Sequence, residues 1–186
     1  SQGEYEKAEE LYEKSLRIRE KVLGENHPST ANSYNNLAVV YLSQGEYEKA
    51  EELYEKSLRI HKKMLGENHP STAGSYNNLA GVYKSQGEYE KAEELYEKSL
   101  RMRKKVLGEN HPDTATNYNN LAWVYEGRGE YKRAVSYYFK AYKVFMLKLG
   151  MNHPDTQIIY KNMKIAYFEW DPKGNFKQWL EEKMKE

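Results

Sequence analysis

The 186-residue sequence contains no cysteine, only five prolines and no long apolar run. Without cysteine the chain can form no disulfide, no thiolate metal site and no cysteine nucleophile. No apolar stretch approaches the ~18 residues that a membrane-spanning helix needs, and no signal peptide opens the sequence. These absences predict a cytoplasmic protein that has no membrane partner.

An excess of charge of one sign is missing as well. The 29 Lys and Arg residues balance the 28 Asp and Glu residues, so the formal net charge is +1. This balance argues against binding to nucleic acid or to an anionic membrane. A mean hydropathy of −1.01 is typical of disordered chains, but 18 tyrosines and regularly spaced apolar residues indicate a folded one.

The most prominent feature of the sequence is repetition at a period of 42 residues. Segments 1–42, 43–84 and 85–126 are near copies, and 127–168 is a diverged fourth. Each copy carries a G-E-Y core near its start and a G-x-N-H-P turn in its middle. A period of this length is typical of stacked repeats. We therefore expect four repeats and a C-terminal capping helix within 169–186, together a fragment of a longer array.

Each copy contains two segments with helical spacing. Between residues 4 and 23, apolar or small residues recur every three or four positions, with acidic residues near the start and basic ones near the end. Gly24 suits the left-handed end of this helix, Pro28 suits the first position of the next, and Asn26 or His27 can cap it. The pattern predicts an all-α fold of about nine helices, at roughly 4–23, 28–43, 46–65, 70–85, 88–107, 112–127, 130–149, 154–170 and 175–185.

Residues 35–54 read N-N-L-A-x-x-Y-x-x-x-G-x-Y-x-x-A-x-x-x-Y, and residues 77–96 repeat this pattern. It resembles the tetratricopeptide repeat (TPR), and the period and the L-G-E-N-H-P turn resemble most the lengthened repeat of kinesin light chains. The resemblance covers nearly the whole chain. It implies a right-handed α-solenoid, a superhelix of antiparallel helix pairs whose concave groove holds an extended peptide or a partner surface. The heptad segment that joins a light chain to its heavy chain is absent, so a motor role does not follow.

Positions that differ between neighbouring copies are candidates for this groove. Val39, Gly81, Trp123 and Ile165 occupy one position of the repeat, and their volumes differ too much for a common place in the core. We expect this position to face a groove whose chemistry changes along its length. The alternative is that free surface positions drift, or that Trp123 packs on the neighbouring helix pair.

Paired asparagines recur in the first three copies. An Asn side chain both donates and accepts, so it can hold the backbone of a peptide without reading its side chains. We expect the first Asn of each pair to face the ligand and the second to be structural or shared. The candidate groove residues are Asn32, Asn35, Val39, Leu42, Asn77, Gly81, Lys84, Asn119, Trp123, Glu126, Lys161 and Ile165.

Histidines recur in the turns at 42-residue spacing, at His27, His69, His111 and His153. Residues one repeat apart cannot share a metal ion whose ligands lie at about 2.0–2.1 Å, so we expect these side chains to cap helices. His61 stands alone and is expected to face solvent. Every polar motif is repeated, whereas an active site is normally single, and no Gly-rich phosphate loop occurs. We predict a protein that is not an enzyme and binds no metal or cofactor.

The leading hypothesis is a protein-interaction scaffold that binds an extended peptide or partner segment in its concave groove. An alternative is an architectural spacer whose near-identical units stack or self-assemble. A third is a regulatory arm attached to a signalling or nucleotide-binding domain. Segment 1–23 would be the second helix of a pair, with the apolar stripe of Leu11, Tyr12 and Leu16 partly open, which allows self-association. Polar and aromatic residues in 169–186 are expected to close the other end.

Overall fold

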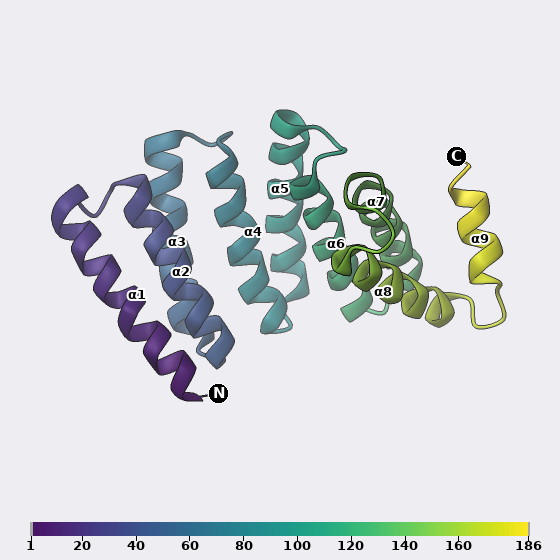
Figure 1. Cartoon of the computed structure of the whole chain (residues 1–186), viewed down its shortest axis with the longest axis horizontal. Coiled ribbons are helices and arrows are strands. Elements are labelled where there is room, and N and C mark those ends of the chain that lie inside the picture. Colours follow the sequence, from purple (N-terminus) through teal and green to yellow (C-terminus); the bar gives the residue numbers. More distant parts are fainter. Residues whose placement is uncertain (1, 186) are drawn as a thin grey trace. The chain divides into compact units, whose positions relative to one another are not determined.

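The computed structural model describes residues 2–185, and their side chains from residue 7 onward. The ends of the predicted segments 1–42 and 169–186, Ser1 and Glu186, lie outside the described residues. Within the described range the chain forms nine helices, which agree with the predicted ranges to within two residues at each end (Figure 1). They are α1 (Gln2–Leu23), α2 (Pro28–Gln44), α3 (Tyr47–Leu65), α4 (Pro70–Ser85), α5 (Tyr89–Leu107), α6 (Pro112–Gly127), α7 (Tyr131–Leu149), α8 (Pro154–Trp170) and α9 (Phe176–Lys183).

Four helices begin in the same way because the G-x-N-H-P turn supplies their caps. The Nδ1 atom of His27 accepts a hydrogen bond from the backbone N–H of Ser29 at 3.1 Å. His69, His111 and His153 likewise accept a hydrogen bond from the backbone N–H of the residue two positions later. The proline that follows each histidine occupies the first helical position, where no N–H is needed. The predicted capping role of these four histidines is confirmed.

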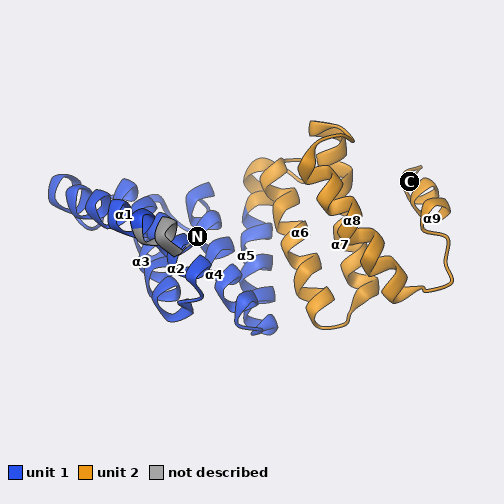
Figure 2. Ribbon diagram, turned by 60° about the horizontal axis from the view of Figure 1, so that its bottom comes forward, with its two compact units in different colours: residues 1–102 blue, residues 103–186 orange. Residues whose placement is uncertain are grey.

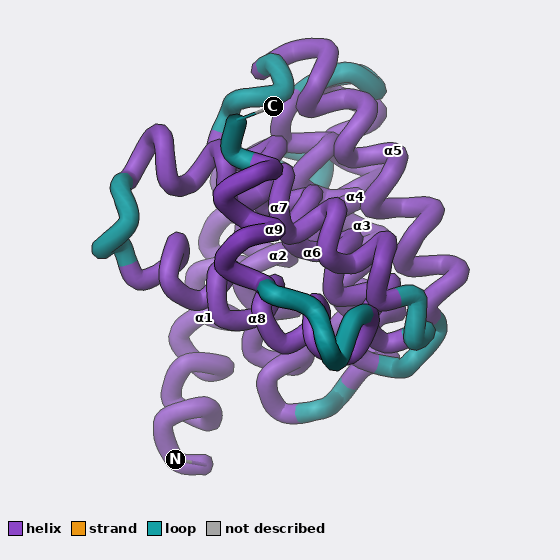
Figure 3. The backbone as a smooth tube through the Cα atoms, turned by 90° about the vertical axis from the view of Figure 1, so that its right-hand side faces the viewer, coloured by secondary structure: helices purple, strands orange, loops and turns teal. Residues whose placement is uncertain are grey.

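The end of α2 shows how the helices turn back. Gly45 has a φ of +81°, and its N–H donates to the carbonyl of Leu42. The N–H of Glu46 donates to the carbonyl of Tyr41 at 2.9 Å, which completes a cap that requires a left-handed residue. The helix therefore stops sharply, and the connection to the next helix is short (Figure 3).

The chain divides into two compact units, residues 1–102 and 103–186 (Figure 2). In the first unit α1 packs on α2, α2 on α3, and α3 on α4. Alanines at 38 and 50 are fully buried and let the helices approach closely, while larger apolar side chains fill the remaining space. The larger members of this core are Leu16, Tyr34, Leu37, Tyr41, Tyr54, Ile60, Leu79 and Val82.

In the second unit α7 packs on both α6 and α8, and α9 contacts α8. The last helix is held by aromatic rings. Phe176 is buried, and its ring lies 5.3 Å from that of Tyr167 and 5.9 Å from that of Trp179. Trp170 lies at the edge of this cluster and remains partly exposed. Aromatic packing therefore closes this end of the core, where the sequence predicts a cap.

The expectation that His61 faces solvent is wrong. Its ring on α3 is 1% exposed, and Nδ1 lies 2.8 Å from the hydroxyl oxygen of Ser75 on α4. The hydrogen bond to Ser75 compensates for the loss of water at Nδ1, Nε2 is buried without a hydrogen-bond partner among the described residues, and burial lowers the pKa of His61. The same bridge joins Arg19 to Ser33 at 2.6 Å and Arg103 to Asn117 at 2.7 Å. Variation between copies therefore does not always mark a position without a packing role.

None of the helices within residues 2–185 combines the length and the apolar character that crossing a membrane requires.

Candidate functional site

The predicted groove residues lie on four helices, two in each unit. In the first unit they are Asn32, Asn35, Val39 and Leu42 on α2, and Asn77, Gly81 and Lys84 on α4. In the second unit they are Asn119, Trp123 and Glu126 on α6, and Lys161 and Ile165 on α8. Helices α2 and α4 contact each other, so the structure brings the candidates of the first unit onto neighbouring elements.

The position with the most variable volume faces open space. The side chains of Val39, Trp123 and Ile165 are 50%, 46% and 48% exposed. At Gly81, an added Cβ atom would meet only the hydroxyl oxygen of Tyr96, at 3.5 Å, which is an ordinary contact. A change of side chain at this position therefore disturbs no core packing and leaves the surface chemistry free to differ between copies.

The position three residues further along each helix has mixed surroundings. Leu42 packs against the core of the first unit, whereas Lys84 is half-buried and burial lowers its pKa. Glu126 accepts a hydrogen bond from the hydroxyl of Tyr138 at 2.6 Å. Burial, and then this bond, raises the pKa of Tyr138. Leu42 and Glu126 therefore make contacts within the fold. Two candidates at other positions of the repeat, Asn32 and Lys161, are exposed.

Asparagines 35 and 119 occupy the same repeat position, one in each unit. In the part of the chain whose side chains are described, the Oδ1 atoms of both are buried and accept no hydrogen bond. At the middle copy, Asn77 donates from Nδ2 to Oδ1 of Asn78 at 3.4 Å. A buried acceptor without a donor costs free energy, so such atoms are rare in folded proteins and call for a partner. The second asparagines differ among themselves: Asn36 is exposed, while Asn78 and Asn120 are half-buried.

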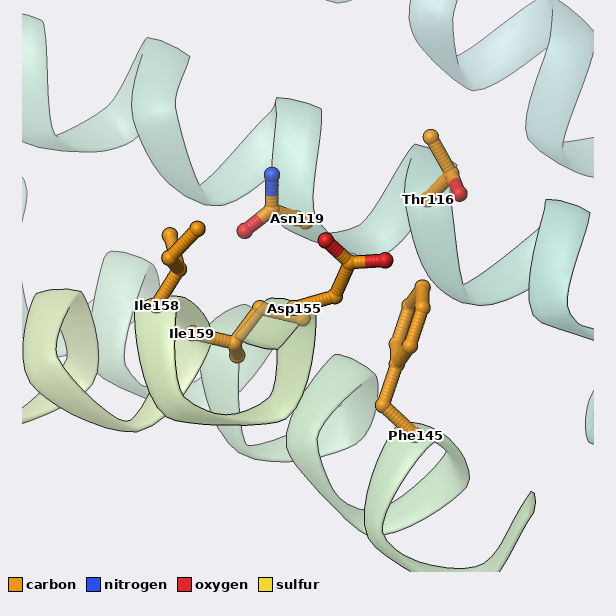
Figure 4. Close-up of a pocket in the computed structure, with 6 residues that line it drawn as sticks. All are labelled: Thr116, Asn119, Phe145, Asp155, Ile158 and Ile159. Atoms are coloured by element: carbon orange, nitrogen blue, oxygen red, sulfur yellow. The ribbon is translucent and has the colours of Figure 1, made fainter. Parts of the chain in front are cut away.

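One of these amides borders a cavity in the second unit (Figure 4). The cavity has a volume of about 260 Å³ and lies between α6, α7 and α8. In Figure 4 the carboxylate of Asp155 reaches from α8 toward Asn119, and the ring of Phe145 stands at the other side. The lining residues are Thr116, Asn119, Phe145, Asp155, Ile158 and Ile159. The cavity thus combines an amide and a carboxylate with apolar walls.

Sequence reasoning missed Phe145, Ile159 and Asp155 as lining residues. The signal for the first two lies in the repeat itself. Phe145 and Ile159 stand at the positions that hold the polar bridge between Arg103 and Asn117 one repeat earlier. Comparing the copies at both positions together would have shown that the fourth copy replaces a hydrogen-bonded pair with an apolar one.

Comparison with known proteins places the chain in a family. A sequence profile described as tetratricopeptide repeat matches residues 1–63, 44–105 and 71–146. Among curated proteins, no sequence matches the chain.

Among the residues whose side chains are described, no three or more metal-ligating side chains form a group that could hold a metal ion.

Solved structures of repeat proteins are similar to the chain over most of its length. The crystal structure of BtubC (BKLC) from P. vanneervenii has a TM-score of 0.78 and 29% identity, and the match covers 90% of this chain and 67% of that one. Two crystal structures of a kinesin light chain-like protein from Podosopora anserina, which has nearly identical TPR-like repeats, have TM-scores of 0.75 and 0.74. Both share 28% identity, and the matches cover 99% of this chain and 85% of those. The chain therefore belongs to the tetratricopeptide repeat family, whose members generally act as protein-interaction or scaffold modules and are typically not enzymes.

Proposed function

We propose that the chain binds extended peptide segments of a partner protein, along α2 and α4 in the first unit and along α6 and α8 in the second. The observation that carries this proposal is the recurrence of a buried, unpaired amide oxygen at Asn35 and Asn119. Each stands four residues before a variable, exposed position, Val39 or Trp123. The general role of the family in protein interaction supports the same conclusion.

The amides would hold the backbone of the ligand. An extended peptide offers N–H and C=O groups at regular intervals, and Asn can accept from the first and donate to the second. Rotation about the Cβ–Cγ bond turns either end of the amide toward the surface at low cost. This bonding does not depend on the side chains of the ligand, so it provides affinity without sequence selectivity.

Selectivity would come from the variable position. Val39 and Ile165 offer an aliphatic surface, Trp123 offers an aromatic one, and Gly81 leaves room for a ligand side chain. In the second unit the cavity beside Asn119 would take an apolar side chain against Phe145 and Ile159. The amide contact recurs in the first three copies, whereas the variable position differs in every copy, which suits recognition of one particular sequence.

A peptide-display library selected on the purified chain tests this proposal. We expect the selected peptides to bind at least about fivefold more weakly to an Asn35→Ala/Asn119→Ala double variant, since each lost hydrogen bond is worth about 0.5–1.5 kcal/mol. The matched control is Asn36→Ala/Asn152→Ala, which removes two exposed amides and should leave the affinity unchanged. Methylation of the peptide's backbone nitrogens should also abolish binding. Unchanged affinity of the first variant, or equal losses in both, would show that the amides do not hold the peptide.

We also propose self-association through α1, because one observation favours it specifically. Ile18 on α1 is 55% exposed, whereas Ile60, its equivalent on α3, is 5% exposed. Leu11 and Val22 extend the same exposed apolar face, and Leu16 is buried against the first core. A second copy that pairs α1 with α1 would cover this face. Light scattering over a concentration series should show a dimer that Ile18→Glu abolishes, and a monomer at every concentration would overturn the proposal.

A further inference from the structure

We infer that the second unit carries a separate binding site for a small amphipathic anion, an apolar or aromatic molecule with a carboxylate or sulfonate group. The site is a cavity of about 410 Å³ between α7, the end of α8 and α9. Its volume falls in the range typical of small-molecule pockets. Its lining residues are Lys132, Val135, Ser136, Phe139, Lys140, Lys143, Trp170, Trp179 and Lys183.

The α7 side of this cavity is a single stripe of the helix, because its residues follow one another at spacings of one, three and four. The stripe differs in charge from the corresponding stripes of the other copies. On α5 the six equivalent residues are Glu90, Glu93, Glu94, Glu97, Lys98 and Arg101. On α3 they are Glu48, Glu51, Glu52, Glu55, Lys56 and Arg59. On α7 they are Lys132, Val135, Ser136, Phe139, Lys140 and Lys143, so all four carboxylates are lost and the basic positions are kept.

Packing of α9 accounts for only part of this change. The rings of Phe139 and Trp179 lie 5.8 Å apart, edge to face, so an apolar residue at 139 serves to dock the last helix. Docking does not require a lysine at 132, where the other copies have glutamate. It also does not explain why, among the residues that line the cavity, four are lysines and none carries a carboxylate.

Two of the four lysines lie against aromatic walls of the cavity, while Lys140 lies over the rings of Tyr118 and Tyr137. The Nζ atom of Lys132 lies 5.8 Å from the ring centre of Trp170, and that of Lys143 lies 5.7 Å from the ring centre of Phe139. Lys140 and Lys143 stand three residues apart on one face of α7, so their like charges repel each other, and an anion beside them relieves the repulsion. The flat apolar part of the ligand would lie against Trp170 and Trp179 and lose its contact with water. The acidic group of the ligand would lie near the lysine ammonium groups.

Both parts of the ligand are needed for this fit. A neutral aromatic molecule gains the apolar contact but no attraction to the ammonium groups, and an inorganic anion gains that attraction but leaves the rings exposed to water. The residues of this cavity differ from the asparagines and variable positions of the proposed peptide groove. A test of the anion site is therefore independent of the peptide proposal.

The test uses 1-naphthalenesulfonate as the probe and the whole chain as the receptor. The chain has three tryptophans, whose indole N–H groups give three signals in a ¹⁵N–¹H spectrum. We expect a saturable shift of the signals of Trp170 and Trp179, which line the cavity, and none of Trp123 on α6. Absence of saturable binding up to millimolar probe, or shifts confined to Trp123, would overturn the inference.

Matched variants test the role of charge. Lys140→Gln/Lys143→Gln should raise the dissociation constant at least tenfold by calorimetry, and Lys132→Gln alone should raise it several-fold. The control Lys148→Gln/Lys164→Gln changes the net charge equally at two exposed positions outside the cavity and should change affinity less than twofold. The neutral analogue 1-naphthalenemethanol should bind at least tenfold more weakly than the sulfonate. Equal affinity for the neutral analogue, or equal losses in the variant and control, would show that the lysines do not recognise an anion.

Discussion

At the scale of the residue, the bridge between neighbouring helices shows how a position can change identity and keep its role. Arginine at 19 and 103 and histidine at 61 each bond a small polar residue fourteen positions later in the chain. The sequence predicts a solvent-facing side chain at His61, which stands alone outside the repeated turns. The burial of His61 could not be predicted, because the residue that bonds its ring comes from the next helix.

Substitution of His61 by arginine should remove a pH dependence of stability. Burial lowers the pKa of His61, the nearby backbone carbonyl of Pro28 raises it, and the nearby charge of His69 lowers it further. The folded protein therefore binds this proton less readily than the unfolded chain, whose histidines have a pKa of about 6.5. The stability that neutral His61 contributes is present above that pH and is lost as the pH falls below it.

Urea unfolding at pH 7.5 and pH 5.5 checks this prediction. The natural chain should lose more free energy of unfolding between the two pH values than His61→Arg does. Arginine at this position has the precedent of Arg19 and Arg103, so the variant should keep the bond to Ser75. The four capping histidines are common to both proteins, and their contribution therefore cancels in the comparison. Equal losses in the two proteins would mean that His61 is not protonated on unfolding.

At the scale of the element, the helix bounds could be predicted because they depend on nearby residues. The Gly and Pro of each turn are four positions apart, and the bonds that end one helix and begin the next are made within the turn itself. The two cavities could not be predicted in this way. Their walls combine residues from three helices, and their existence depends on which side chains fill the space between those helices.

Two glycines of the first unit should respond oppositely to alanine. Gly81 lies inside α4, where a Cβ atom meets only ordinary contact, so Gly81→Ala should raise the free energy of unfolding by about 0.5–1 kcal/mol. Gly87 has a φ of +79° between α4 and α5, so Gly87→Ala should lower it by about 1 kcal/mol although the space around it is empty. Chemical denaturation of both variants checks the signs, and destabilisation by Gly81→Ala would mean that the hydroxyl of Tyr96 cannot adjust.

At the scale of the whole molecule, the division into two compact units should appear in unfolding. All three tryptophans, Trp123, Trp170 and Trp179, lie in the second unit. Their fluorescence therefore reports on residues 103–186, while circular dichroism reports on helices throughout the chain. Repeat proteins are stabilised mainly by contacts between neighbouring elements, so a local change should act mainly on its own unit.

A matched pair of core substitutions tests this division. Leu121→Ala removes a buried side chain of the second unit, and should cost about 2–5 kcal/mol there. The fluorescence transition in urea should then occur before the circular dichroism transition. Leu79→Ala makes the equivalent change one repeat earlier, in the first unit, and should shift the circular dichroism transition while fluorescence changes less. If both signals shift together in both variants, the chain unfolds as one body.

The histidine-capped turn also bears on how such a chain can evolve. Each turn meets the needs of its own backbone through bonds among residues that are close in sequence. A 42-residue cassette can therefore be duplicated or deleted by recombination at any of these joints, and the new junction will be chemically the same as the old one. A gain or loss of repeats would then leave the capping hydrogen bonds of every turn unchanged.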